Sequence, residues 1–138
     1  MPEATEFPVP TPHPNSDDQA FWDGLTEDHL SLPQCRACDH VIWYPRPVCP
    51  ACGGSDVEWI DASGDGTIYS FSVTRKIPGR FSEHVPFVVA YVELDEGPRV
   101  LTNIVDANVE AVHVGQRVSA VFHAGKEATA ILRFRPAD

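Results

Sequence analysis

Residues 35–52 read Cys35-Arg-Ala-Cys38-Asp-His-Val-Ile-Trp-Tyr-Pro-Arg-Pro-Val-Cys49-Pro-Ala-Cys52, and this stretch decides the fold. It holds all four cysteines of the chain, in two Cys-x-x-Cys pairs separated by ten residues. The two-residue spacing lets both sulfurs of a pair reach one ion while backbone amides of the turn point at them. Two such turns complete a tetrahedral shell of sulfurs, so we predict that Cys35, Cys38, Cys49 and Cys52 bind a metal ion.

Zinc is the expected ion, and iron in the same four-sulfur geometry is the alternative. Four protein ligands leave no open coordination position, so the predicted role is structural and not catalytic. Gly53 follows the second pair and is expected to supply a positive φ that turns the chain under the metal. Asp39 takes the equivalent place after the first pair. Clustered cysteine pairs in a chain without a secretory signal favour a reducing compartment and predict a cytoplasmic protein.

The residues before the cysteines form two segments. Residues 1–15 contain five prolines and are predicted to be a disordered, acidic arm. Ser16 stands three residues before Gln19, which is a capping-box spacing, so a short helix is expected over about 17–25 within a helical segment 16–29. Apolar side chains on this helix need a surface to cover, either in the domain itself or in a partner protein. These candidate partner-binding residues are Phe21, Trp22 and Leu25.

The residues after the helix are predicted to form a ribbon over 30–61, with short strands at 30–34, 41–44 and 57–60, followed by a β domain over 62–138. In the β domain, apolar and polar residues alternate with a period of 2, which places Thr67, Tyr69, Phe71 and Val73 on one face of a strand. The five strands expected there are 67–74, 87–94, 99–105, 117–124 and 127–134. The fold class is therefore mainly β, with a five-stranded OB-fold barrel as the simplest match and a sandwich fragment as the alternative.

Charge and motifs restrict the function. The net charge of −10 argues against a nucleic-acid surface, and no apolar stretch is long enough to span a membrane. No motif of a catalytic nucleophile, phosphate loop or dinucleotide site is present, so no catalytic residue is assigned. Arg75, Lys76 and Arg80 form a local basic loop that could meet phosphates or be an ordinary solvated loop.

A series of motifs extends over about residues 17–136. It comprises Phe21-Trp22-Asp23-Gly24-Leu25, Leu30-x-Leu32-Pro33-x-Cys35, Pro45-Arg46, Cys49-Pro50-x-Cys52-Gly53, Gly64-x-Gly66-Thr67, Pro86-Phe87, Asp95-Glu96-Gly97, Gly115-x-x-Val118 and Phe134-x-Pro136. In this order the motifs resemble the DUF35 family, in which a rubredoxin-like zinc ribbon is joined to an acyl-CoA-associated OB-fold.

The resemblance implies an accessory subunit with structural Zn²⁺ that scaffolds a thiolase-like enzyme, either a β-ketothiolase or an acyl-CoA retro-aldolase such as those of steroid side-chain degradation. It also implies an acyl-CoA thioester bound jointly with the partner, and a MaoC-like hydratase as a further partner. We add the expectation that Arg75, Lys76 and Arg80 contact the phosphates of coenzyme A.

Two other functions remain open at this point. The first is a module that binds single-stranded nucleic acid, in which Tyr69, Phe71 and Phe122 would stack on bases. The second is a stand-alone protein that binds or hydrolyses acyl-CoA. Turnover of acyl-CoA by the lone protein would favour the second function, and a salt-dependent response to an oligonucleotide would favour the first.

Overall fold

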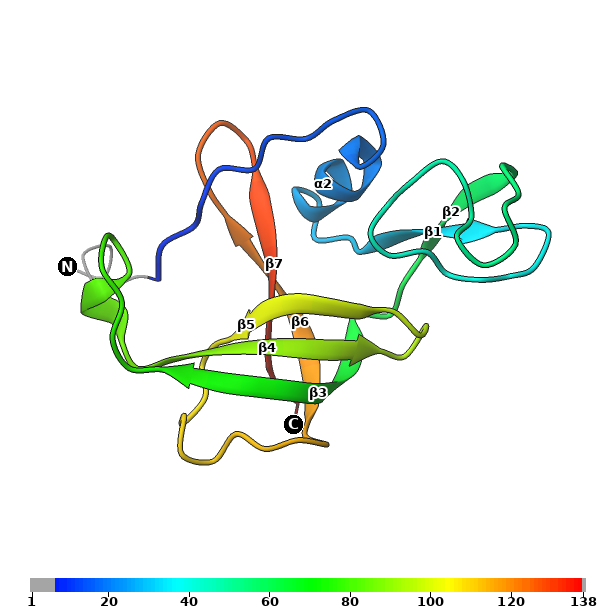
Figure 1. Cartoon of the computed structure of the whole chain (residues 1–138). Coiled ribbons are helices and arrows are strands. Elements are labelled where there is room, and N and C mark those ends of the chain that lie inside the picture. Colours follow the sequence, from blue (N-terminus) through cyan, green and yellow to red (C-terminus); the bar gives the residue numbers. More distant parts are fainter. Residues whose placement is uncertain (1–6, 138) are drawn as a thin grey trace.

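The alternating residues of the C-terminal part form five strands that close into a barrel, as the computed structural model of residues 7–137 shows (Figure 1). The strand order is β3-β4-β5-β7-β6, and β6 returns to pair with β3. All pairings are antiparallel except that of β5 with β7, which is parallel. The predicted five-stranded barrel is confirmed. Its strands are β3 (Asp65–Thr74), β4 (Phe87–Leu94), β5 (Arg99–Ile104), β6 (Arg117–Ala124) and β7 (Ala130–Pro136), with a 3₁₀ turn η1 (Ser82–His84) before β4.

Strand β3 contains a bulge that the alternation of the sequence did not predict. Ile68 pairs with Val92 and Ser70 pairs with Tyr91, so Tyr69 is an extra residue in the ladder. Ile68 therefore faces the core before the bulge, and Phe71 and Val73 pack against the core after it. The prediction that Thr67, Tyr69, Phe71 and Val73 share one face was wrong, because one extra residue reverses the side-chain direction.

Strand β7 begins at Ala130, three residues later than predicted. Glu127 and Ala128 have φ values of 58° and 57°, which belong to a turn and not to a strand. The turn is closed by a hydrogen bond of 2.7 Å from the Gly125 N–H to the Thr129 carbonyl. The hairpin loop is consequently longer than the Gly125-Lys126 turn that the sequence indicates.

The ribbon that carries the cysteines has two strands, β1 (Ser31–Cys35) and β2 (Val57–Asp61), which pair antiparallel. The strand predicted over 41–44 is reduced to an isolated bridge between Gln34 and Val41. The prolines at 45 and 47 follow at once, and proline cannot donate to a ladder.

Helix α2 (Gln19–Leu25) begins two residues later than predicted. Its N-cap is Asp18, and the side chain of Asn15 accepts hydrogen bonds from the N–H groups of Asp17 and Asp18, at 2.8 and 3.0 Å. The capping-box prediction for Ser16 was therefore wrong. A short helix at this place is confirmed.

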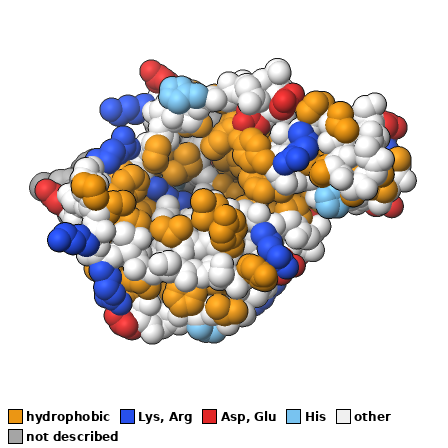
Figure 2. Space-filling model, in the orientation of Figure 1, with side chains coloured by type: hydrophobic (Ala, Val, Ile, Leu, Met, Phe, Trp, Pro, Cys, Tyr) orange, Lys and Arg blue, Asp and Glu red, His pale blue; other side chains and the backbone are white. Residues whose placement is uncertain are grey.

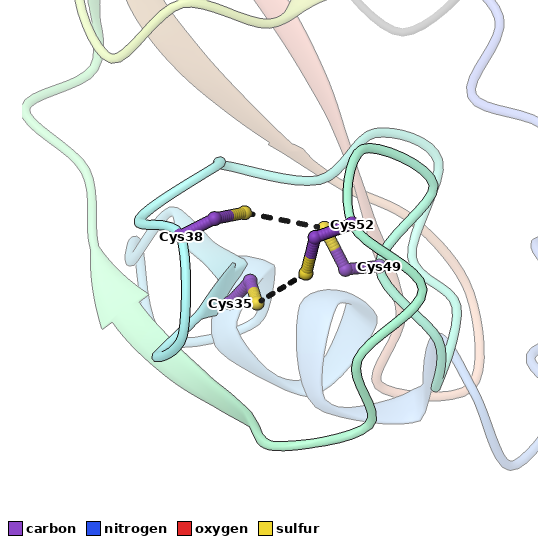
Figure 3. A group of neighbouring side chains, drawn as sticks. All are labelled: Cys35, Cys38, Cys49 and Cys52. Carbon is purple, nitrogen blue, oxygen red and sulfur yellow. Dashed lines mark hydrogen bonds between the residues drawn. The ribbon is translucent and has the colours of Figure 1, made fainter.

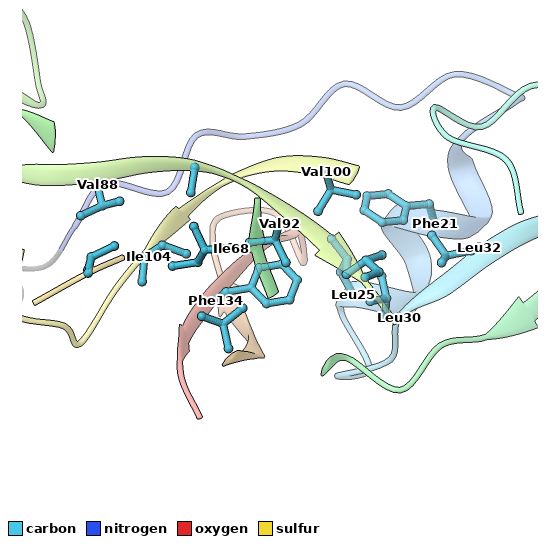
Figure 4. Close-up of a cluster of buried hydrophobic side chains, with 14 of the residues drawn as sticks. Phe21, Leu25, Leu30, Leu32, Ile68, Val88, Val92, Val100, Ile104 and Phe134 are labelled. Carbon is cyan, nitrogen blue, oxygen red and sulfur yellow. The ribbon is translucent and has the colours of Figure 1, made fainter. Parts of the chain in front are cut away.

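One hydrophobic core joins the helix, the ribbon and the barrel (Figure 4). Phe21 and Leu25 of α2 pack with Leu30 and Leu32, and these four belong to the same buried cluster as barrel residues such as Val100. Polar contacts fix the connections. The Ser63 N–H donates to Glu96 of the β4–β5 turn at 2.9 Å, and the His29 ring contacts Asp61 at 2.6 Å. The ribbon is thus held in one orientation against the barrel.

Residues 7–15 extend from the η1 end of the barrel, past β7, to α2 (Figure 1). Near their start, Phe7 packs against Phe81 and Phe87, with ring centroids 5.3 and 5.1 Å apart. The predicted arm over 1–15 lies partly outside the described residues, and the predicted segment boundaries stay predictions. Within residues 7–137, no helix combines the length and the apolar character needed to cross a membrane.

Candidate metal centre

The four cysteines converge on one point between the two turns of the ribbon (Figure 3). All four sulfurs lie within 4.8 Å of one another, with Cys35 and Cys52 at 3.6 Å and Cys38 and Cys49 at 3.7 Å. A tetrahedral zinc ion with Zn–S bonds of about 2.3 Å requires sulfurs about 3.8 Å apart. The cluster therefore fits a structural zinc ion.

The two cysteine turns have the same backbone geometry. The Asp39 N–H donates to the Cys35 carbonyl and the Gly53 N–H donates to the Cys49 carbonyl, both at 2.8 Å. Asp39 has φ 66° and Gly53 has φ 80°, so the two predicted left-handed positions are confirmed. Each turn thus folds its second cysteine back toward the first.

The sulfurs also have backbone donors, and the neighbouring thiols change one another's pKa. The N–H groups of Ala51 and Gly54 each donate to a cysteine sulfur at 3.4 Å. Burial raises the pKa of the Cys49 thiol, but the backbone N–H groups of Cys52 and Ala51 and the neighbouring thiols outweigh it and lower the pKa to about 7. The His40 N–H lowers the pKa of Cys38, yet burial and the three other sulfurs together raise it to about 12.

The short distances between the four sulfurs favour a bound cation. Four thiolates at such distances repel one another, and a divalent cation removes that cost. With all four positions of a tetrahedral shell taken by sulfur, the ion would hold the ribbon together and would offer no position to a substrate. Within residues 7–137, this cluster is the one group of three or more Cys, His, Asp or Glu residues placed to share an ion.

The candidate partner-binding residues divide into two kinds. Phe21 and Leu25 have exposed fractions of only 3% and 1%, so the domain itself covers them. Trp22 is half-buried and packs edge-on to the Phe21 ring at 5.0 Å. A partner contact by this helix stays a prediction, and Trp22 is the residue available to make it.

The basic loop is exposed to solvent. Arg75 forms an ion pair of 3.2 Å with Glu110, and Lys76 and Arg80 are exposed in the same loop between β3 and η1. The structure thus places the three cations on one surface segment, and their contact with phosphates remains a prediction.

The aromatic residues considered for base stacking lie in three different environments. Tyr69 is exposed, but the Arg99 guanidinium covers its ring at 3.8 Å. Phe71 packs against the core, and Phe122 lines a cavity at the end of the barrel. The structure therefore gives these three side chains no common stacking surface.

Two polar features were missed in the sequence. Asp18 has an exposed fraction of 5% and accepts a hydrogen bond of 2.5 Å from the Tyr44 hydroxyl. Arg133 has an exposed fraction of 2% and lies behind the cavity that Phe122 lines. An arginine flanked by Leu132 and Phe134 in the apolar part of β7 was the signal that could have found the second feature.

Comparison with known families divides the chain into two domains. Residues 22–58 match the "ChsH2, rubredoxin-like zinc ribbon domain", and residues 59–123 match the "ChsH2, C-terminal OB-fold domain". The boundary falls between the cysteine turns and the first barrel strand. The family assignment of residues 22–58 agrees with the zinc geometry described above.

Curated relatives carry related names. A "DUF35 domain-containing scaffold protein" of Methanocaldococcus jannaschii is 39% identical over 108 residues, which are 77% of each chain. A "Probable enoyl-CoA hydratase alpha subunit" of Thermomonospora curvata is 35% identical, over 87% of this chain and 38% of the relative. The "3-oxo-4,17-pregnadiene-20-carboxyl-CoA hydratase alpha subunit" of Mycobacterium tuberculosis is 34% identical, over 80% of this chain and 35% of the relative. This chain thus spans little more than a third of the two hydratase subunits.

A solved structure described as "Ltp2-ChsH2(DUF35) aldolase" contains a chain with the same fold. The two chains superpose with a TM-score of 0.83 and are 32% identical, over 92% of this chain and 99% of the other. The similarity therefore includes the helix, the ribbon and the barrel together.

Proposed function

Since this chain belongs to the DUF35 family and carries its ChsH2-type zinc ribbon and OB-fold, we propose that it is a non-catalytic scaffold subunit of a thiolase-like enzyme of acyl-CoA metabolism. The observation that carries the proposal is the likeness to the ChsH2(DUF35) chain of an aldolase, which extends over nearly all of both chains. A metal shell closed by four cysteines supports a structural role for the ribbon.

The reaction of the partner is proposed to be a carbon–carbon cleavage of an acyl-CoA, either by a β-ketothiolase or by a retro-aldolase. A steroid-derived acyl chain is the favoured substrate, because one relative is named for a pregnadiene carboxyl-CoA. The same relative supports a MaoC-like hydratase as a further partner. The cysteine cluster suits a reducing environment, so we place the complex in the cytoplasm.

Coenzyme A is proposed to bind jointly to this chain and its partner. Arg75, Lys76 and Arg80 are exposed on one loop, where they could meet the phosphates of the nucleotide as point charges. The ion pair of Arg75 with Glu110 is on the surface and is weak enough to be exchanged for a phosphate contact.

The test is co-expression of this chain, tagged, with the thiolase-like enzyme of its host, followed by size-exclusion chromatography with light scattering. We expect a stoichiometric complex that cleaves its acyl-CoA substrate faster than the partner alone. A chain that elutes alone, or that turns over acyl-CoA by itself, would contradict the proposal. Titration with a labelled oligonucleotide tests the nucleic-acid alternative on the same sample.

The joint binding of coenzyme A has its own test. The triple change of Arg75, Lys76 and Arg80 to Gln should leave the complex intact and raise the KM for acyl-CoA several-fold. The KM for the corresponding acyl-pantetheine, which lacks the nucleotide phosphates, should not change. The matched control is the double variant Lys126→Gln/Arg135→Gln, which removes exposed cations elsewhere. Equal KM values for the triple variant and the control would refute a role for the loop.

A further inference from the structure

A cavity of about 600 Å³ lies at the end of the barrel where β5 and β6 finish and β4 begins. Apolar side chains from four segments line it, among them Phe7, Phe87, Ile104 and Phe122. Hydrophobic side chains gather around a hollow on the face shown in Figure 2. Pockets for small ligands have volumes of about 300–1,000 Å³ and combine apolar side chains with a few polar groups. The cavity has this size, and His84, Asp106 and His123 line it beside the apolar side chains.

Arg133 lies behind one wall of this cavity. Its guanidinium donates a hydrogen bond of 2.9 Å to Nδ1 of His123 and a second one to the Pro8 carbonyl, and its Cζ lies 4.3 Å from the centre of the Phe7 ring. Phe7 and His123 both line the cavity. The guanidinium is thus in direct contact with two residues of the cavity lining.

The charge of Arg133 has no counter-charge in the described part of the chain. None of the ion pairs among residues 7–137 includes Arg133. Burial lowers its pKa to about 10, so the guanidinium remains charged at neutral pH. Since arginine only donates hydrogen bonds, His123 accepts this one at Nδ1. Asp106, the acid of the cavity lining, is exposed. The Nε of Arg133 also donates to Oδ1 of Asn103 at 3.4 Å, so its partners are neutral oxygens, an imidazole and a phenyl ring. A buried cation with only such partners favours an anion.

We infer that the cavity binds a small ligand with an apolar body and one carboxylate. The apolar body fills the cavity, and the carboxylate replaces the Pro8 carbonyl on Arg133. A carboxylate forms shorter and stronger hydrogen bonds with arginine than a neutral carbonyl does, and it can bind both terminal nitrogens at once. Binding therefore moves Phe7–Val9 outward. This site does not depend on the proposed scaffold function.

The experiment is a titration of the full-length, zinc-bound protein with octanoate, followed by the amide signals of residues 104–107 and 122–124 in NMR spectra. The comparison ligand is 1-octanol, which has the same chain and no charge. We expect saturable shifts with octanoate, which include the amides of Phe7 and Val9, and binding of 1-octanol at least tenfold weaker. Equal affinity for the two ligands, or no saturable shift with octanoate at millimolar concentration, overturns the inference.

Variants separate the two parts of the site. Arg133→Gln should weaken octanoate binding at least tenfold, whereas the control Arg135→Gln removes an exposed cation from the same strand and should not change it. Should Arg133→Gln fail to fold, Ala107→Phe provides a second test, because Ala107 lines the cavity and a phenyl group there fills it. Octanoate binding to Ala107→Phe at the wild-type affinity would refute the site.

Discussion

At the residue scale, a buried hydrogen bond connects the N-cap of helix α2 with the ribbon. The Tyr44 hydroxyl donates to the buried carboxylate of Asp18. Burial raises the pKa of Asp18, but the bonds from Tyr44 and from the Asn15 backbone outweigh it and hold the pKa below its usual value. Burial and the Asp18 carboxylate raise the pKa of Tyr44. The bond thus stabilises the fold while Asp18 is ionised.

Tyr44→Phe should lower the free energy of unfolding by about 1–2 kcal/mol at pH 7, because it removes a donor from a buried carboxylate. Asp18 has a depressed pKa, so its stabilisation is complete above the unfolded pKa of about 3.9 and is lost as the pH falls through the folded value. The difference between wild type and Tyr44→Phe should therefore shrink below about pH 4. Urea denaturation of wild type and Tyr44→Phe, at pH 7 and at pH values below about 4, measures this difference in the free energy of unfolding. The exposed Tyr91, changed to Phe, is the control, and a similar loss there would contradict a specific role for Tyr44.

The two cysteine turns place different residues in the same strained backbone conformation. Gly53→Ala should destabilise the zinc-bound protein by about 1 kcal/mol, because a side chain at φ 80° is unfavourable. Asp39→Gly, at φ 66°, should leave stability unchanged or raise it slightly. Thermal denaturation at saturating zinc compares the two. If both substitutions changed stability by the same amount in the same direction, the expected difference between Gly53 and Asp39 would be refuted.

At the scale of elements, we expect the ribbon to depend on the metal ion that its four cysteines are placed to bind. It has two strands of five residues, and a separate buried cluster of Cys35, Ile42 and Cys49 supports the cysteine turns. Two-stranded sheets are marginally stable in water. The inner part of the ribbon consists largely of the candidate metal ligands, so its stability should follow metal occupancy.

Zinc removal by a chelator, or Cys49→Ser, should unfold the cysteine turns while the barrel keeps its strands. Metal analysis of the wild-type protein should give one zinc per chain, and NMR amide shifts should report the loss of ribbon structure. His40→Ala is the matched control, because it changes an exposed residue beside Cys38 that is not a ligand. Unchanged ribbon shifts in metal-free protein would refute a structural role for the ion. In the complex, the same treatment should abolish partner binding.

Sequence reasoning succeeded where the determining contacts are local. The strands over 87–94 and 117–124 were predicted with their observed bounds, because each is a run of mostly β-branched, aromatic and apolar residues between turn residues. The cysteine cluster was predicted because the spacing of its ligands is itself the geometric requirement. The bulge at Tyr69 was not predicted, because it depends on how β3 bends to pair with both β4 and β6. The contact of Arg133 with Pro8 joins residues 125 positions apart, which no local pattern shows.

For the whole molecule, the shared core makes the helix a structural connector between ribbon and barrel. Phe21→Ala should cost about 3–5 kcal/mol, as expected for loss of a buried phenyl group. Trp22→Ala should cost less, because Trp22 is only half-buried. If this helix meets the partner, Trp22→Ala should instead weaken complex formation. Chemical denaturation measures the stability of both variants, and light scattering measures their binding to the partner. Equal destabilisation by the two changes would contradict the difference in burial between Phe21 and Trp22.

The barrel closes through an uneven set of strand pairings. Strands β5 and β7 meet at one pair, Ile104 with Phe134, together with a hydrogen bond of 2.7 Å from the Val105 N–H to the Phe134 carbonyl. Every other junction is built from three to eight pairs of residues. This junction also borders the cavity, because Ile104 and Val105 line it.

Amide hydrogen exchange should show that the β5–β7 junction opens more often than the other strand junctions of the barrel. Breaking the β5–β7 junction costs few hydrogen bonds, so the Val105 amide should exchange with solvent well before the amides of β4, whose opening requires the whole barrel to unfold. Exchange of Val105 at the global unfolding rate would contradict this. The barrel is thus a closed sheet with one weak junction, between β5 and β7. Molecules that enter its interior would pass through a local opening of that junction, and the rest of the barrel would stay folded.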